Sequence, residues 1–183
     1  GAYKERALQY IDPRGRNLIA RDGHRYFYLR DHATGEIWSP GWHPVQNELD
    51  EYSCAHGLGY SKLASLKNGI RINLRWFVPE SSPCEVWTFE ITNERSETAE
   101  LDVFSFVDLL LQGYPAYCDY YSSLRGEYDE ESGVLTCING SPDRTHEWFD
   151  AFLASDRKPV GFHTSRRRFL GNFGHVNAAE AVV

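Results

Sequence analysis

The sequence predicts a mainly β fold, built as an antiparallel β-sandwich, and three observations carry that prediction. Aromatic residues make up 14% of the 183 residues and methionine is absent, a composition that favours strands. Short segments with strand character recur along the chain, separated by turn-forming residues, as they do in sandwiches. No segment longer than about 10 residues has a convincing helical period. The length fits a single domain, residues 1–183, that can bury a substantial core.

The first predicted strand covers residues 25–30, where the sequence is Arg-Tyr-Phe-Tyr-Leu-Arg. Residues 31–36 contain Thr34-Gly35 and form the predicted turn into a second strand at Ile37-Trp38. Residues 38–61 then hold two Trp, two Tyr, two His, two Pro and three Gly within 24 residues. Their apolar residues follow neither a helical nor a strand period for long, so we predict a shaped loop system here.

The next predicted strands are the most regular in the chain. A short strand at 60–66 leads into Asn68-Gly69, the strongest short hairpin signal. After it, the apolar residues alternate with polar ones and predict a half-buried antiparallel strand. The members of its apolar face are Ile70, Ile72, Leu74, Trp76 and Val78.

Four more strands are predicted in the second half of the chain. Residues 84–93 place Trp87, Phe89 and Ile91 on one face. Residues 101–107 are apolar on both faces, which predicts a central strand. Segments 124–128 and 134–138 flank a turn and form a predicted hairpin, and 148–154 forms another strand.

Charge and composition exclude several classes of function. The formal net charge of −7 argues against binding to nucleic-acid backbones, which requires a basic surface. No apolar run of about 18 residues predicts a membrane span, and no secretory leader is visible. The four cysteines lie far apart, with no C-x-x-C pair, and predict free thiols in a cytoplasmic protein. They are Cys54, Cys84, Cys118 and Cys137.

The residues by themselves name no reaction. The dense acidic segments, 50–51 and 129–131, lie in predicted turns, where carboxylates are ordinarily solvated rather than catalytic. His43, Cys54 and His56 have the donor atoms that zinc prefers, but no further ligand follows at a regular spacing, so we predict no metal site. Motifs for serine nucleophiles, phosphate loops and dinucleotides are absent.

Tryptophan is the remaining candidate for sugar stacking. Trp76, Trp87 and Trp148 lie in predicted strands and are expected to be core residues. Trp38 and Trp42 lie in the predicted loop system, where a core role and a sugar-facing role remain equally open.

Several blocks, in the same order along the chain, resemble one known family. The blocks are Arg25-Tyr-Phe-Tyr-Leu, Gly35-Glu-Ile-Trp-Ser-Pro40, Leu49-Asp-Glu-Tyr52, His56-Gly-Leu-Gly-Tyr-Ser61, Phe77-Val-Pro79, Val86-Trp-Thr-Phe-Glu-Ile-Thr-Asn93 and Phe104-Ser-Phe-Val107. They resemble the N-terminal domain of the inverting disaccharide phosphorylases of glycoside hydrolase family 94, formerly glycosyltransferase family 36. This family includes the cellobiose and chitobiose phosphorylases, and the likeness runs from about residue 25 to residue 171.

The resemblance implies a supersandwich of the galactose mutarotase type, of which this chain is an incomplete N-terminal portion. In the family, a separate (α/α)6 barrel performs reversible phosphorolysis and releases sugar 1-phosphate, with inorganic phosphate as co-substrate and no cofactor. That barrel is absent from this sequence, so we expect the isolated chain to carry no catalytic residue and to be inactive. The expected partners are a carbohydrate substrate, the barrel domain and a second copy in a homodimer.

The same resemblance implies that this domain shapes the acceptor side of the active site and builds the dimer interface. The residues expected on that surface are Trp38, Trp42, His43, His56 and Tyr121. The family's Phe-Asp-Thr-Asp-Arg stretch appears here as Phe162-His-Thr-Ser-Arg166, with both Asp replaced, so the acceptor sugar is not implied. The alternative hypothesis is a free-standing carbohydrate-binding or assembly module.

Overall fold

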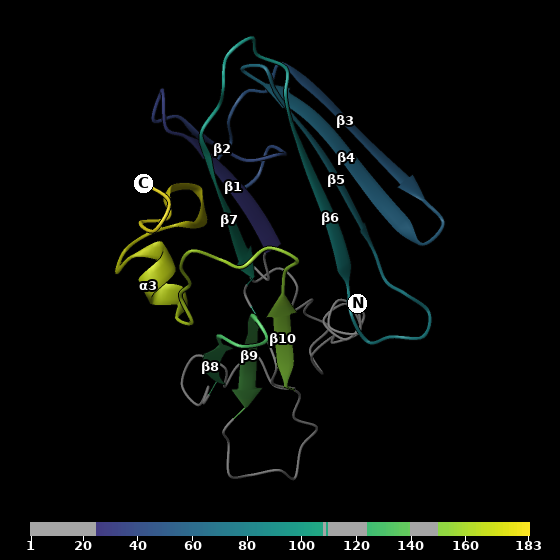
Figure 1. The fold of residues 1–183 in the computed structure, drawn as a ribbon, viewed down its shortest axis with the longest axis vertical. Coiled ribbons are helices and arrows are strands. Elements are labelled where there is room, and N and C mark those ends of the chain that lie inside the picture. Colours follow the sequence, from purple (N-terminus) through teal and green to yellow (C-terminus); the bar gives the residue numbers. More distant parts are fainter. Residues whose placement is uncertain (1–24, 108, 110–123, 140–149) are drawn as a thin grey trace, which may run out of the picture.

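The computed structural model describes residues 25–107, 109, 124–139 and 150–183. Antiparallel strands dominate the described residues and form three sheets (Figure 1). The strands are β1 (Arg25–Asp31), β2 (Ile37–Trp38), β3 (Glu51–Gly57), β4 (Tyr60–Lys67), β5 (Ile70–Phe77), β6 (Val86–Asn93), β7 (Leu101–Val107), β8 (Leu124–Asp129), β9 (Val134–Asn139) and β10 (Ala151–Ala154). The helices are α3 (Arg166–Leu170) and the 3₁₀ turn η2 (Val176–Ala178). The predicted mainly β fold is confirmed.

The first sheet has the order β2-β1-β7, and the predicted hairpin of residues 25–38 forms one half of it. The turn is closed by the backbone N–H of Gly35, which donates to the carbonyl of Asp31 at 2.8 Å. Gly35 has φ +71°, a left-handed conformation that glycine adopts without steric cost. The turn chemistry read from the sequence therefore places β2 beside β1.

The second sheet has the order β3-β4-β5-β6, and its central hairpin is the predicted Asn-Gly turn. Asn68 and Gly69 both have positive φ, 48° and 72°, as a two-residue hairpin loop with the twist of its strands requires. The alternation predicted for β5 is confirmed for Ile70, Ile72 and Leu74, which are buried while the residues between them are not. It does not extend to the end of the predicted face, because Trp76 is half-buried and Val78, beyond the end of β5, is 45% exposed.

The predicted loop system of residues 38–61 is largely wrong, because β3 and the start of β4 lie within it. Seven cross-strand pairs, from Glu51↔Leu66 to Gly57↔Tyr60, join the two strands. Every residue of β3 is exposed, so the strand lacks the buried apolar alternation by which strands are recognised. Pairing with β4 holds it instead, and the irregular segment is confined to residues 39–50.

The prediction that residues 101–107 form a central strand is also wrong. Among the described residues β7 is at the edge of its sheet and β1 is in the middle. Both faces of β7 are apolar for another reason: Leu101 packs on one hydrophobic cluster and Phe106 belongs to the other. The β1 sheet is thus a middle layer with a core on each side.

The two clusters show what covers each face of β1. On one face, Leu29 packs with Trp38, Ile70 and Ile72, which join the first sheet to the second. On the opposite face, Tyr28 and Phe106 pack against the segment that contains α3, through a group of Phe169, Leu170, Ala179 and Val182. Burying each large side chain contributes about 1.5–3 kcal/mol, so the C-terminal segment is held chiefly by these contacts.

A hydrogen bond reinforces the C-terminal contact. The Tyr28 hydroxyl donates to the carbonyl of Val176 at 2.7 Å, and burial raises the pKa of this hydroxyl well above its usual value. The helix α3 lies in the arginine-rich stretch and is five residues long. None of the helices among the described residues has the length and apolar character needed to cross a membrane.

The third sheet contains β8, β9 and β10, in the order β10-β9-β8. The predicted hairpin of residues 124–138 is confirmed, with Glu127↔Thr136 among its pairs. The strand predicted at 148–154 is observed as Ala151–Ala154, while residues 148 and 149 lie outside the described residues. In Figure 1 this sheet lies below the first and second sheets.

Candidate functional site

The loop of residues 39–50 is organised by one buried serine and one asparagine. Asn47 Oδ1 accepts hydrogen bonds from the backbone N–H of Ser39 at 2.9 Å and from its hydroxyl at 3.2 Å. The Ser39 hydroxyl also lies 2.8 Å from the Gly41 carbonyl and accepts from the N–H of Val45. Because Ser39 is fully buried, these bonds satisfy its polar groups and fix the loop that carries Trp42.

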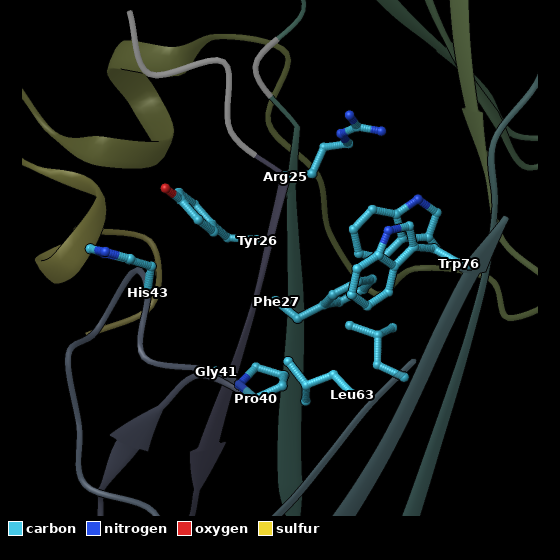
Figure 2. A pocket seen from close by; sticks show the side chains of 10 residues that line it. Arg25, Tyr26, Phe27, Pro40, Gly41, His43, Leu63 and Trp76 are labelled. Carbon is cyan, nitrogen blue, oxygen red and sulfur yellow. The ribbon is translucent and has the colours of Figure 1, made fainter. Parts of the chain in front are cut away.

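A cleft of about 220 Å³ opens between this loop and the ends of the first and second sheets (Figure 2). Strand β1 contributes its first residues, the loop contributes Pro40, Gly41 and His43, and the second sheet supplies the opposite wall. The lining is mainly apolar and aromatic. Its members are Arg25, Tyr26, Phe27, Pro40, Gly41, His43, Leu63, Leu74, Trp76 and Trp87.

The aromatic wall of the cleft is a stacked pair of indoles. Trp76 and Trp87 face each other across β5 and β6, with ring centroids 5.4 Å apart and planes inclined by 17°. Phe27 packs against Trp87 at 5.5 Å. Both tryptophans are only partly buried, so part of each ring faces the cleft rather than the core.

One ion pair lies behind this wall. Arg25 pairs with Glu85, and the indole N–H of Trp87 donates to the same carboxylate at 2.7 Å. The guanidinium carbon of Arg25 lies 5.8 Å from the centre of the Trp87 ring, within cation–π range. Glu85 is therefore used to orient Arg25 and Trp87. Among the described residues that line the cleft there is no carboxylate, so the cleft can bind a ligand but lacks an acid–base pair.

Beside the cleft, the second sheet extends beyond its covering layer and leaves an exposed ledge. We define the ledge as Tyr52, Cys54 and His56 of β3, which share the inward-facing side of the sheet. A side chain placed at Gly41 would come within 3.4 Å of Leu63 and 3.9 Å of Tyr52, so the loop backbone borders the ledge. Tyr52 of the ledge is 55% exposed, and Trp42 of the neighbouring loop is 57% exposed.

The cross-strand register links the ledge to the cleft. His56 pairs with Ser61, Ser61 pairs with Trp76, and Trp76 pairs with Trp87. Directly paired residues project from the same face of a sheet. His56 is therefore at the end of the row that forms the aromatic wall, although 20 residues separate it from Trp76 in the sequence.

The structure separates the five residues predicted for this surface. Trp38 is fully buried between the first and second sheets, which corrects its placement on a sugar-facing or interface surface. Its partners Leu29 and Ile70 come from other strands, and this contact was not visible in the local sequence. Trp42 is exposed, and His43 lines the cleft (Figure 2). His56 lies on the ledge rather than in a tight turn, and Tyr121 lies outside the described residues.

The acidic segments serve turns and ion pairs. Asp129 accepts from the hydroxyl of Ser132 and from the backbone N–H groups of Glu131 and Ser132, and these bonds hold its pKa below the usual value. Asp50 accepts from the N–H of Asn68, and Glu51 pairs with Arg71 at 3.0 Å. These carboxylates have structural partners.

The three residues weighed as metal ligands do not come together as one set. Cys54 Sγ lies 3.6 Å from His56 Nε2, whereas His43 lines the cleft. Within the described part of the chain, no group of three His, Cys, Asp or Glu side chains is arranged to hold a metal. The predicted free thiols are observed for Cys54, Cys84 and Cys137, while Cys118 lies outside the described residues.

Several residues of the site were missed by the sequence reasoning. Trp76 and Trp87 were expected in the core, yet they are half-buried and form the cleft wall. Their position near the ends of β5 and β6, next to Phe77 and Val86, could have indicated partial burial, because the ends of strands lie at the open edge of a β-sandwich. Ser39 and Asn47 have side chains that favour loops, but no sequence motif distinguishes them from other loop residues.

Comparison with known proteins identifies related sequences over nearly the whole chain. The model of the glycosyl hydrolase 94 supersandwich domain matches residues 5–183, which confirms the resemblance carried by the ordered blocks. Solabiose phosphorylase of Paenibacillus borealis is 46% identical over 185 residues, covering 100% of this chain and 24% of that protein. The 3-O-beta-D-glucopyranosyl-beta-D-glucuronide phosphorylase of the same organism is 32% identical over 86% of this chain and 21% of its own length.

A third relative matches a shorter segment. N,N'-diacetylchitobiose phosphorylase of Vibrio proteolyticus is 42% identical over 90 residues, 48% of this chain and 11% of that protein. The chain thus spans about a quarter or less of the length of these curated relatives.

Proposed function

We infer the function from the family: the chain belongs to the glycosyl hydrolase 94 supersandwich family, and we propose that it is the N-terminal portion of an inverting β-glycoside phosphorylase. The full protein would cleave a β-linked disaccharide or oligosaccharide with inorganic phosphate, reversibly, and release sugar 1-phosphate. The observation that carries this proposal is the 46% identity to solabiose phosphorylase across the entire chain. We propose that inorganic phosphate is the co-substrate of the full enzyme and that no organic cofactor takes part.

The proposed role of this domain is to form one wall of the acceptor side of the active site. Trp42 and Tyr52 offer exposed ring faces beside the cleft, and His43 and His56 offer ring nitrogens that can hydrogen-bond sugar hydroxyls. We place the acid–base chemistry on a separate barrel domain, in keeping with the lack of a carboxylate among the described residues that line the cleft. We further propose that the full enzyme is a homodimer in the cytoplasm, where free thiols persist.

The release of sugar 1-phosphate tests the proposal that this domain shapes the site while the barrel domain carries out the catalysis. The chain and the full-length protein are incubated separately with phosphate and solabiose, cellobiose, laminaribiose or chitobiose, and sugar 1-phosphate is measured. We expect release by the full-length protein with at least one disaccharide and none by the chain. Release by the chain alone would show that catalytic residues lie within it, and inactivity of the full protein on the whole panel would contradict the phosphorylase proposal.

A variant pair tests the acceptor wall in the full-length protein. Trp42→Ala should raise KM for the acceptor sugar in the synthetic direction by about tenfold, because one stacking face is worth roughly 1–2 kcal/mol. Phe173→Ala is the matched control, since Phe173 is 97% exposed and lies in the C-terminal segment. Equal effects of the two substitutions would contradict the proposed wall.

The alternative function, a carbohydrate-binding or assembly module, is favoured by the exposed aromatic groups of Trp42 and Tyr52. Calorimetry of the chain with β-glucan oligosaccharides distinguishes it. Binding that Trp42→Ala abolishes would favour the module, whereas no binding would favour a wall that is completed only by the barrel. Trp38→Ala is not informative here, because Trp38 is buried.

A further inference from the structure

The proposed acceptor wall uses Tyr52 and His56 of the ledge but gives no role to the thiol of Cys54 between them. Tyr52, Cys54 and His56 alternate along β3 and therefore project from the same face. All three are exposed. A thiol thus lies between a phenol and an imidazole on the rim of the sheet.

The imidazole is placed to take a proton from the thiol. Cys54 Sγ lies 3.6 Å from His56 Nε2, and His56 Nδ1 lies 2.8 Å from Ser61 Oγ. If the Nδ1 proton is donated to the Ser61 hydroxyl, Nε2 is left as an acceptor directed at the sulfur. Ser61 is the cross-strand partner of His56, so β4 fixes the ring. A nucleophile, a base and a group that orients the base are the three parts of an activated thiol.

The surroundings of Cys54 distinguish it from the other described thiols. Cys137 is buried, and burial, with a smaller contribution from Asp150, raises the pKa of its thiol. Cys84 is half-buried. Among the described residues neither of these thiols contacts a histidine, whereas Cys54 is exposed and has His56 beside it. The cross-strand partner of Cys54 is Leu63, which brings no charge to the thiol.

We propose that Cys54 is a modification site: a reactive thiol that forms a mixed disulfide with a low-molecular-weight disulfide, with His56 as the base. The thiol proton passes to His56 Nε2, and the sulfur attacks one sulfur of the reagent. The S–S bond of the reagent breaks as the new S–S bond to Cys54 forms. The departing thiolate takes up the proton from His56. One disulfide is consumed and one is formed, so no other oxidant is needed.

The modification would alter the ledge itself. A bound thiol group at Cys54 would lie beside Tyr52 and near the loop that carries Trp42. This inference is independent of the proposed phosphorylase function, because it depends only on the chemistry of the thiol and its neighbours.

The test is the rate at which oxidised glutathione modifies each cysteine of the full 183-residue chain at neutral pH, followed by peptide mapping and mass spectrometry. We expect Cys54 to react at least about tenfold faster than Cys84 and Cys137, because it is exposed and has a base beside it. His56→Gln, which keeps a side chain able to bond Ser61, should slow the reaction of Cys54 by about tenfold. Ser61→Ala should slow it by a smaller factor.

His32→Gln is the matched control, because His32 is an exposed histidine that pairs with Asp102 on the other sheet. It should leave the reaction of Cys54 unchanged. Thermal unfolding of each variant shows whether the fold is retained, which is expected because β3 is exposed throughout. Unchanged reactivity of Cys54 in His56→Gln, or equally rapid modification of Cys84 or Cys137, would overturn the proposal.

Discussion

Strands β3 and β5 belong to the same sheet and project side chains from the same inner face, yet their surroundings are opposite. Ile72 on β5 is 1% exposed, while Tyr52, two strands away in the same cross-strand row, is 55% exposed. The difference arises from the covering layer: β1 and β2 pack over β5 and end before β3. One continuous hydrogen-bonded sheet therefore contributes to the core at β5 and forms the exposed ledge, with its reactive thiol and its aromatic side chain, at β3.

The largest effect should come from the side chain that joins the two layers. Trp38→Ala should destabilise the chain by about 3–5 kcal/mol, because it empties a large volume between the sheets. Among the described residues no acceptor pairs with the indole N–H of Trp38, so Trp38→Phe should cost clearly less. Urea denaturation measures both. A loss below about 1 kcal/mol for Trp38→Ala would show that the layers are not joined there.

The second largest loss of stability should come from breaking the ion pair between Arg95 and the buried Asp31. Arg95 Nη1 lies 2.6 Å from Asp31 Oδ2, and Asp31 is 1% exposed. Removing the guanidinium in Arg95→Ala leaves a buried carboxylate without its counter-ion and should cost roughly 3 kcal/mol at neutral pH. Urea denaturation at pH 7 measures this loss.

The pH dependence of the stability loss in Arg95→Ala tests whether the unpaired carboxylate of Asp31 causes it. Burial alone would raise the pKa of Asp31, but the hydrogen bond and charge of Arg95 and the N–H of Ala33 bring it below the usual value of 3.8. A lowered folded-state pKa contributes stability above the unfolded-state value, and this contribution disappears as the pH falls through the folded-state value. The deficit of Arg95→Ala should therefore be full at neutral pH and shrink below about pH 4. A deficit that is constant with pH would point to lost packing instead.

A smaller effect is expected from trimming one methyl group on β5. Ile72→Val should cost about 0.5–1.5 kcal/mol, because the site under β1 is closely packed. Thermal unfolding followed by circular dichroism measures the change. No measurable loss of stability in Ile72→Val would indicate that the side chains of β1 and β2 are not closely packed against β5.

The smallest effects should come from the uncovered side. Tyr52→Ala and Trp42→Ala should each change the free energy of unfolding by less than about 0.5 kcal/mol, because both side chains are more than half exposed. The same two denaturation assays apply. A loss of more than about 1 kcal/mol for either would mean that the ledge carries structural contacts of its own.

Much of the fold could be predicted from local patterns. The Asn68-Gly69 turn, the alternation of Ile70, Ile72 and Leu74, and the hairpin after Arg25 depend on backbone preferences and side-chain period within a few residues, and all three are confirmed. The supersandwich family was predicted from ordered blocks and is confirmed over residues 5–183.

The candidate site was predicted less completely, because its residues meet only through the sheet. Trp76 and Trp87 belong to the cleft wall because β5 and β6 pair in one register and the loop after Trp38 folds back over their ends. Strand β3 was missed because none of its residues is buried, so its pattern lacks the contrast that reveals a strand.

The sequence by itself determined the turns, the strand period, the family and the free thiols, because these depend on chemistry within short segments or on matched blocks. The tertiary structure decided which of those segments is covered. Trp38 and Trp42 are four residues apart in the same stretch of the sequence, yet Trp38 is fully buried and Trp42 is 57% exposed. Burial depends on which distant strand packs against a residue: Ile70 and Ile72 of β5 pack against Trp38 from the second sheet, whereas Trp42 and the ledge of β3 are exposed to solvent.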